Sequence, residues 1–508
     1  MHKHREHEQW ATRAGFILAA VGSAIGLGNI WRFPYVAYEN GGGAFLIPYL
    51  VALLTAGIPL LVLEYTIGHR FRGSPPLSFR RMARPAEAIG WWQVAICFII
   101  SVYYAVIIAW AVRYTGFSIG LQWGDDPDTF LFGEFLQVAD EPGIVSSYVA
   151  GVAWPLAAVW AVTLGVLAFG VRQGIERANK IFIPVLVVVF GALVVRAVTL
   201  EGSELGLNAL FTPDWSAITD GAVWVAAYGQ IFFSLSVGFG IMITYASYLR
   251  RRADLTGSAL VAGFANSSFE ILAGIGVFAT IGFMAAASGV AVDEVATSGI
   301  GLAFVAFPAI ISTLPATPEL FGLLFFGSLV VAGLSSLISI VQVVVSTVRD
   351  RFGLARVPAV LLVGGAAALV SITLFPTSEG LYILDAADHF INQYGVALAA
   401  LVIVITVGWV LRKLPEQRAH ANLTSAVPLG TWWLIVLGVV TPLGLGWMMW
   451  DSLRQELAVN YEGYETGFLL LAGWGVAFAA IAFGVVMALL RWRAADQLPP
   501  VEVEERSR

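Results

Sequence analysis

The chain has 508 residues, of which 58% are hydrophobic and only 12% are charged, and its formal net charge is −6. Soluble globular chains carry about 25% charged residues, so this composition excludes a disordered chain, a nucleic-acid-binding protein and an ordinary soluble enzyme. The single cysteine, Cys97, excludes an intramolecular disulfide. With a mean hydropathy of +0.80, the chain is predicted to be a polytopic protein of the lipid bilayer.

Apolar segments long enough to cross a bilayer recur along the whole chain. A helix needs about 20 mostly apolar residues for this, and by that measure we expect about twelve helical spans. In chain order they cover residues 13–37, 43–68, 90–117, 148–170, 181–200, 222–248, 257–286, 320–348, 357–375, 382–411, 430–450 and 464–491. The first is not a signal peptide, because it is too long and contains Arg32.

Basic residues are confined to the tails and to every second loop. Of the 28 Lys and Arg, those that fall elsewhere are Arg32, Arg113, Arg196 and Arg454, and the alternate loops are acidic. Cytoplasmic loops carry the excess of basic residues in membrane proteins. The pattern therefore predicts a multi-pass protein of the cell membrane with both termini in the cytoplasm.

Two of the expected spans contain glycine-rich stretches near mid-bilayer. Residues 22–29 read GSAIGLGN, and residues 234–240 read SLSVGFG. Glycine inside a helix costs about 1 kcal/mol relative to alanine, and unwound backbone in a membrane must line a cavity or be buried in protein. Close helix packing through Gly22 and Gly26 is the alternative interpretation.

The position of these stretches favours a transport site. They fall in the first and sixth spans, which are the first helices of two five-helix halves, and interrupted helices at corresponding positions of an inverted repeat mark such sites. Exposed N–H groups at half-helix ends attract an anion, while freed carbonyls and Asn or Ser oxygens suit a small cation. An amino acid together with Na⁺ is the simplest pair that satisfies both.

Seven strings carry a resemblance to a known family. They are WATR at 10–13, GLGN at 26–29, RFP at 32–34, ENGGGAF at 39–45, GIER at 174–177, QIFF at 230–233 and TYASY at 244–248. In this order they resemble the neurotransmitter:sodium symporter family, in the prokaryotic branch that includes the bacterial leucine transporter. The resemblance implies an all-α membrane protein of about 12 helices, with the 5+5 inverted repeat of the leucine-transporter fold and unwound helices 1 and 6.

The same resemblance implies how the chain is divided. We expect a cytoplasmic N-tail with inner-gate residues at 1–12, a first repeat at 13–200, an extracellular connection at 201–221, a second repeat at 222–411, helices 11 and 12 at 412–491 and a cytoplasmic C-tail at 492–508. Helices 11 and 12 serve contacts between protomers in this family, so a homodimer is possible.

Two sodium sites are implied by the resemblance. The first would use the Ala24 carbonyl, the side chains of Asn29, Ser234 and Asn266, and the substrate carboxylate. The second would use the carbonyls of Gly22, Ile25 and Ala332 with the hydroxyls of Ser335 and Ser336. Ser234 and Ser335 replace threonines of the leucine transporter but keep the hydroxyl. From the residues alone, the two adjacent serines could equally bond to their own helix.

A substrate site is implied in the same way. The substrate carboxylate would meet the N–H groups of Leu27 and Gly28 and the hydroxyl of Tyr104, and the ammonium would meet the carbonyls of Ala24 and Phe233 together with Ser236. The side-chain pocket would consist of Ile100, Tyr104, Phe233, Phe239, Ser336 and Ile340. This wall holds no acid or base, and an unpaired buried charge costs several kcal/mol. A hydrophobic or neutral α-amino acid such as leucine, methionine, valine or alanine is therefore favoured.

Charged residues near the span ends are assigned to gates by the resemblance. Arg32 and Asp388 would form the outer gate, and Asp350 would pair with an N-tail arginine at the inner gate. The sequence departs from the family here, because His7 stands three residues before Trp10 and Arg5 stands five before it. Either Arg5 or His7 could serve the inner gate.

Two acidic residues are expected inside the spans. Glu270 lies four residues after Asn266, hence on the same helix face, at the position where chloride-independent members of the family supply a carboxylate. Transport without chloride is therefore expected, and proton antiport is open. Glu64 is expected to have a partner in a polar network.

The resulting prediction is a symporter, not an enzyme, that imports a hydrophobic or neutral α-amino acid with Na⁺ by alternating access. The alternatives are the transport of another small zwitterion, such as betaine, taurine or a γ-amino acid, and a nutrient sensor on a transporter scaffold.

Overall fold

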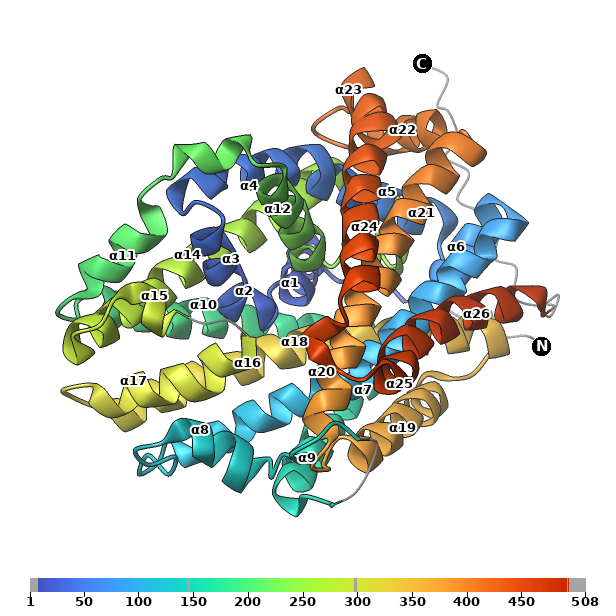
Figure 1. The fold of residues 1–508 in the computed structure, drawn as a ribbon. Helices are drawn as coiled ribbons and strands as arrows, with labels where there is room; N and C mark the ends of the chain where they lie inside the picture. Colours follow the sequence, from blue (N-terminus) through green and yellow to red (C-terminus); the bar gives the residue numbers. More distant parts are fainter. Residues whose placement is uncertain (1–7, 144–146, 297–298, 491, 493–508) are drawn as a thin grey trace.

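The structure, a computed structural model, describes residues 8–143, 147–296, 299–490 and 492. In these residues the chain is helical, and β-structure is limited to two isolated bridges. Ten continuous helices are long and apolar enough to cross a membrane. An eleventh span is bent by 58° between Arg13–Ala24 and Gly28–Glu39. Figure 1 shows these helices packed into one bundle.

We number the spans in chain order. Span 1 consists of α1 (Arg13–Ala24), α2 (Gly28–Trp31) and α3 (Phe33–Glu39), and span 6 of α12 (Gly221–Ser234) and α13 (Ile241–Ser247). The continuous spans are 2 (Gly43–Phe71), 3 (Arg84–Phe117), 4 (Ala150–Ala168), 5 (Val171–Val198), 7 (Leu255–Ser288), 8 (Pro318–Phe352), 9 (Arg356–Leu374), 10 (Gly380–Val410), 11 (Thr431–Gly463) and 12 (Thr466–Leu489).

The predicted spans are found close to their expected positions, with one clear difference at a helix start. Span 5 was expected to begin at residue 181, but the helix begins at Val171. The polar residues at its start remain helical because the buried Glu176 accepts hydrogen bonds from the backbone of Ala11 (2.7 Å) and the hydroxyl of Thr12 (2.9 Å). A contact with the chain start, which hydropathy does not register, thus extends this helix.

Span 1 is interrupted where the glycines predicted a break. Helix α1 ends at Ala24, the next residue, Ile25, has an extended conformation (φ −72°, ψ 95°), and helix restarts at Gly28. The side chain of Asn29 accepts a hydrogen bond of 2.8 Å from the backbone N–H of Gly26. A polar side chain thereby replaces a lost helical hydrogen bond at the break, as a buried backbone requires.

Span 6 is interrupted at residues 235–240. Ser236, Gly238 and Gly240 all have positive φ (53°, 88° and 79°), a conformation that glycine adopts without steric cost. At Gly238, the backbone N–H donates to Glu64 (2.9 Å) and the carbonyl accepts from Gln93 (2.8 Å). Glu64 therefore has the polar partner that we expected, and it lies on the unwound backbone.

Candidate functional site

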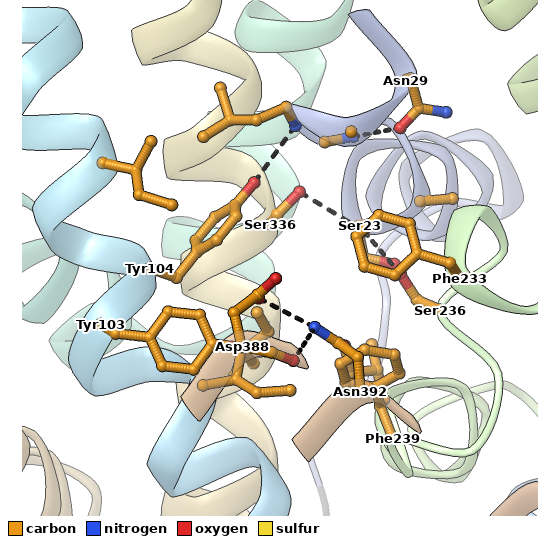
Figure 2. Close-up of a pocket in the computed structure, with 18 of the residues that line it drawn as sticks. Ser23, Asn29, Tyr103, Tyr104, Phe233, Ser236, Phe239, Ser336, Asp388 and Asn392 are labelled. Atoms are coloured by element: carbon orange, nitrogen blue, oxygen red, sulfur yellow. Dashed lines mark hydrogen bonds between the residues drawn. The ribbon is translucent and has the colours of Figure 1, made fainter. Parts of the chain in front are cut away.

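A cavity of about 110 Å³ lies between the two broken helices. Every residue predicted for the substrate site lines it, namely Ala24, Leu27, Gly28, Ile100, Tyr104, Phe233, Ser236, Phe239, Ser336 and Ile340. They come from spans 1, 3, 6 and 8, so segments hundreds of residues apart in the sequence meet here. Figure 2 shows several of these side chains pointing into the same space.

The polar groups of the cavity gather around the break in span 1. The hydroxyl of Tyr104 accepts a hydrogen bond of 3.3 Å from the backbone N–H of Leu27. On the facing side, Ser236 donates 2.9 Å to the carbonyl of Ser23 (Figure 2). An added Cβ at Gly28 would lie 2.4 Å from the ring of Phe233. Only glycine allows the backbone and this ring to approach so closely.

The side chains predicted for the first sodium site form one buried cluster. The side-chain amide nitrogen of Asn29 donates to Asn266 Oδ1 (3.0 Å) and to Ser234 Oγ (3.3 Å), and the amide of Asn266 also donates to Ser234. All three side chains are buried. Asn29 and Ala24 both line the cavity, so the cluster extends to the cavity wall.

The groups predicted for the second sodium site also converge. Ser335 Oγ lies 2.7 Å from the carbonyl oxygen of Gly22 and 2.8 Å from that of Ala332. Ser336 Oγ lies 3.3 Å from the carbonyl oxygens of Gly22 and Ile25. Five oxygens from spans 1 and 8 thus share one small volume, which is the donor set that a small hard cation prefers. The alternative of bonding to their own helix holds in part, since Ser335 donates to the Ala332 carbonyl of span 8, but both hydroxyls also reach carbonyls of span 1.

Glu270 lies beside the first cluster. Its carboxylate accepts a hydrogen bond of 2.6 Å from Gln230 in α12 and another from the hydroxyl of Tyr49 in α4 (Leu46–Ala52). The side chain is fully buried. A carboxylate with fixed donors from two other spans supplies a stationary acceptor next to the Asn29, Ser234 and Asn266 group.

At one end of the cavity, Arg32 and Asp388 lie apart. The Arg32 guanidinium lies 4.7 Å from the centre of the Phe233 ring. Asp388 accepts a hydrogen bond of 2.8 Å from Asn392, one turn along the same span (Figure 2). The outer-gate ion pair that the resemblance implied is therefore not formed in this structure; Asp388 lines the cavity, and Arg32 packs on Phe233, which also lines it.

The cavity wall also contains Asp388, which was expected at the outer gate, and two polar residues that the sequence did not indicate, Tyr103 and Asn392. The expectation of a wall without an acid was therefore wrong at this end of the cavity. Hydropathy cannot reveal this, since Asp388 enters the cavity only because α20 (Gly380–Phe390) packs against span 3.

At the opposite end, residues 8–10 pack against spans 6, 8 and 9. Trp10 donates through its indole N–H to the carbonyl of Tyr245 (2.8 Å) and through its backbone N–H to that of Tyr248 (3.2 Å). Glu8 forms ion pairs with Arg349 (2.7 Å) and Arg356 (2.6 Å). This end of the bundle is closed.

The expected inner-gate pair of Asp350 with Arg5 or His7 is not tested by the described residues. Asp350 accepts a hydrogen bond of 2.8 Å from the backbone N–H of Ser74, and Arg5 and His7 lie outside the described residues. The described part of the N-tail instead brings an acid, Glu8, to two arginines. Glu8 was not predicted, because the family pattern has a basic residue before Trp10. The available signal was an acidic residue two positions before this tryptophan, together with the basic loop at 349–356.

Two broken helices that enclose a cavity within a bundle of membrane-length helices define a secondary transporter. A model of the sodium:neurotransmitter symporter family matches residues 7–131 and 125–495. The chain belongs to that family.

Known relatives agree with this assignment. The chain is 42% identical over 488 residues to an uncharacterized sodium-dependent transporter of Methanocaldococcus jannaschii, covering 96% of this chain and 98% of the relative. It is 30% identical over 473 residues to the sodium- and chloride-dependent GABA transporter 2 of Homo sapiens, covering 85% and 77%. The crystal structure of MhsT in complex with L-phenylalanine is similar with a TM-score of 0.74 and 33% identity, covering 88% of this chain and 99% of MhsT. The predicted leucine-transporter fold is confirmed, and both fold and family are those of transporters and not of enzymes.

Proposed function

We propose that the protein imports a hydrophobic or neutral α-amino acid together with Na⁺ by alternating access. The observation that carries this proposal is the cavity itself. Backbone N–H groups at Leu27 and Gly28 begin a half helix, where the dipole favours a carboxylate, and the carbonyls across the break favour an ammonium. Ile100, Phe239 and Ile340 supply an apolar wall for the side chain.

Two ions would be carried with each substrate. The Gly22, Ile25, Ala332, Ser335 and Ser336 oxygens suit one Na⁺ as they stand. The second would lie among Asn29, Ser234 and Asn266, where the oxygens of Ser234 and Asn266 already converge. This ion would also meet the substrate carboxylate, so that substrate and Na⁺ strengthen each other's binding.

Chloride would not be needed. The Glu270 carboxylate, held by Gln230 and Tyr49, would supply next to the first ion the negative charge that an anion supplies elsewhere. The GABA transporter 2 named above is chloride-dependent. Glu270 would be the residue that makes the present chain independent of chloride.

On this proposal, the structure would correspond to a step in which the cavity faces outward. Arg32 and Asp388 form no ion pair, whereas Glu8 and Trp10 pack against the other end. If the basic loops and both termini are cytoplasmic, as the charge pattern predicts, the unpaired end faces the outside.

Binding to the purified protein in lipid nanodiscs tests this function. Radiolabelled leucine, methionine, valine, alanine and phenylalanine are titrated in NaCl, sodium gluconate and KCl, with γ-aminobutyrate and betaine as competitors. We expect saturable binding of at least one α-amino acid in both sodium salts and none in KCl. Phenylalanine belongs in the panel because MhsT binds it. Competition by γ-aminobutyrate alone, or binding in KCl, would contradict the proposal.

A further inference from the structure

The first part of span 10 carries polar residues on two different faces. Asp388 in α20 and Asn392 in the π-helical segment that follows it line the cavity. Asp385 and His389 are also four residues apart and therefore share a face of their own. A π-helical segment, Ile391–Ala397, follows directly after α20. Such segments interrupt regular helical bonding and are frequent at functional sites, so α20 can shift relative to the rest of span 10.

The second face of α20 is held by the end of span 11. We call residues 456–464, which include the end of α24 (Thr441–Ala458) and the turn η11 (Tyr461–Gly463), the 456–464 segment. His389 Nε2 is in contact with the carboxylate of Glu456, and its ring stacks on Tyr461 at 3.8 Å and 17°. Asp385 accepts hydrogen bonds from the hydroxyls of Tyr461 (3.2 Å) and Tyr464 (3.0 Å).

We propose that His389 and Glu456, together with Asp385 and the two tyrosines, form a clamp through which span 11 positions Asp388. His389 directly follows Asp388, so a helix held at His389 fixes the direction of the Asp388 side chain. In the present structure Asp388 is hydrogen-bonded to Asn392 and forms no ion pair with Arg32, which lies over the Phe233 ring. The clamp therefore stabilises the state in which Arg32 and Asp388 are apart, and loosening it favours their approach.

This inference rests on the proposed function only for its effect on transport, so the test reads the clamp directly. Hydrogen–deuterium exchange is measured on the full chain in nanodiscs at a single pH. The peptide of interest covers residues 381–390. The variants are H389Q and E456Q, and the matched control is R454Q, which removes an exposed ion pair to Asp451 (3.1 Å) on the same helix.

We expect the protection of residues 381–390 to be about fivefold lower in H389Q and E456Q than in the wild type, because hydrogen bonds to charged partners are about twice as strong as neutral ones. R454Q should behave like the wild type. Protection in H389Q equal to that of the wild type would overturn the clamp. If H389Q does not fold, the same comparison in E456Q decides.

A binding arm connects the clamp to function. H389Q should bind the identified amino acid severalfold more tightly than the wild type, because Asp388 is freed to approach Arg32. Unchanged affinity would show that the clamp does not position Asp388. If the wild type binds no amino acid in Na⁺, the proposed function fails, and the exchange data still decide whether the clamp exists.

Discussion

Glu270 and Gln230 are joined by a hydrogen bond of 2.6 Å between spans 7 and 6, and Tyr49 from span 2 donates to the other carboxylate oxygen. Three spans therefore meet at one acidic side chain. Because Ser234 follows Gln230 by one helical turn, a change at Glu270 is transmitted to the oxygen cluster beside the cavity. This arrangement leads to the first prediction.

Replacing Glu270 by serine should make binding depend on chloride. The substitution removes the fixed charge and leaves space between Tyr49 and Gln230 for an anion. We expect E270S to lose most Na⁺-dependent amino-acid binding in gluconate and to recover it in chloride, while the wild type binds equally in both. Titration of chloride against labelled substrate measures this. E270Q removes the charge but still fills the space between Tyr49 and Gln230, so chloride should not restore its binding. Restoration of E270Q by chloride would contradict the argument.

Removing either hydroxyl of span 8 should weaken the response to Na⁺. Ser335 and Ser336 each contribute an oxygen within 3.3 Å of the Gly22 carbonyl. Loss of one such ligand is expected to cost about 1.5–3 kcal/mol, or roughly tenfold to a hundredfold in Na⁺ affinity. The measurement is the half-saturating Na⁺ concentration for substrate binding in S335A and S336A. S328A, on the same span and bonded only to the carbonyl of Phe325, is the control.

Removing the charge of Glu8 should open the sealed end. Glu8 holds Arg349 and Arg356, and Arg356 also donates 2.8 Å to Gln342. The C97S substitution removes the one native thiol of the sequence. The S339C substitution places a thiol at a buried position near this end, and its alkylation rate measures how accessible that position is to water. We expect E8Q to raise its alkylation rate about tenfold, which corresponds to about 1.4 kcal/mol. E416Q, which breaks the exposed ion pair to Arg70, should leave the rate unchanged.

Acid should weaken the contact between α22 (Leu414–Asn422) and span 2. His420 Nε2 and His69 Nδ1 lie 2.9 Å apart. Burial, reinforced by His69, Arg70 and Arg72, lowers the pKa of His420 to about 3. Below about pH 6.5, His420 therefore binds a proton in the unfolded chain but not in the folded chain. The free energy of unfolding is thus unaffected by this residue above pH 6.5 and decreases as the pH falls from about 6.5 toward about 3. The melting temperature of the wild type should drop between pH 7.5 and 5 more than that of H420Q. Parallel curves would refute this.

Much of the fold could be predicted because it depends on local composition. The glycines of residues 22–29 and 234–240 lower helix stability where they stand, and both breaks are found there. The cavity residues are a different case. Ile100 and Ile340 are indistinguishable from core residues by hydropathy, and only the family resemblance placed them in a pocket.

What could not be predicted depends on contacts between distant segments. Glu8 acquires its role only because spans 8 and 9 present two arginines to the chain start. Asn392 is an unremarkable residue of an apolar span in the sequence, and it lines the cavity because of how the π-helical segment Ile391–Ala397 packs. Neither relationship leaves a periodic signal in the sequence.

The Ser336 hydroxyl borders two compartments at once, since it lines the cavity and also lies 3.3 Å from the carbonyls of Gly22 and Ile25. Whatever occupies one compartment therefore alters the orientation of a group that the other needs. Under the proposed function, slippage, in which the ion crosses without its cargo, would be opposed at this shared oxygen as well as at the ion that meets the substrate carboxylate.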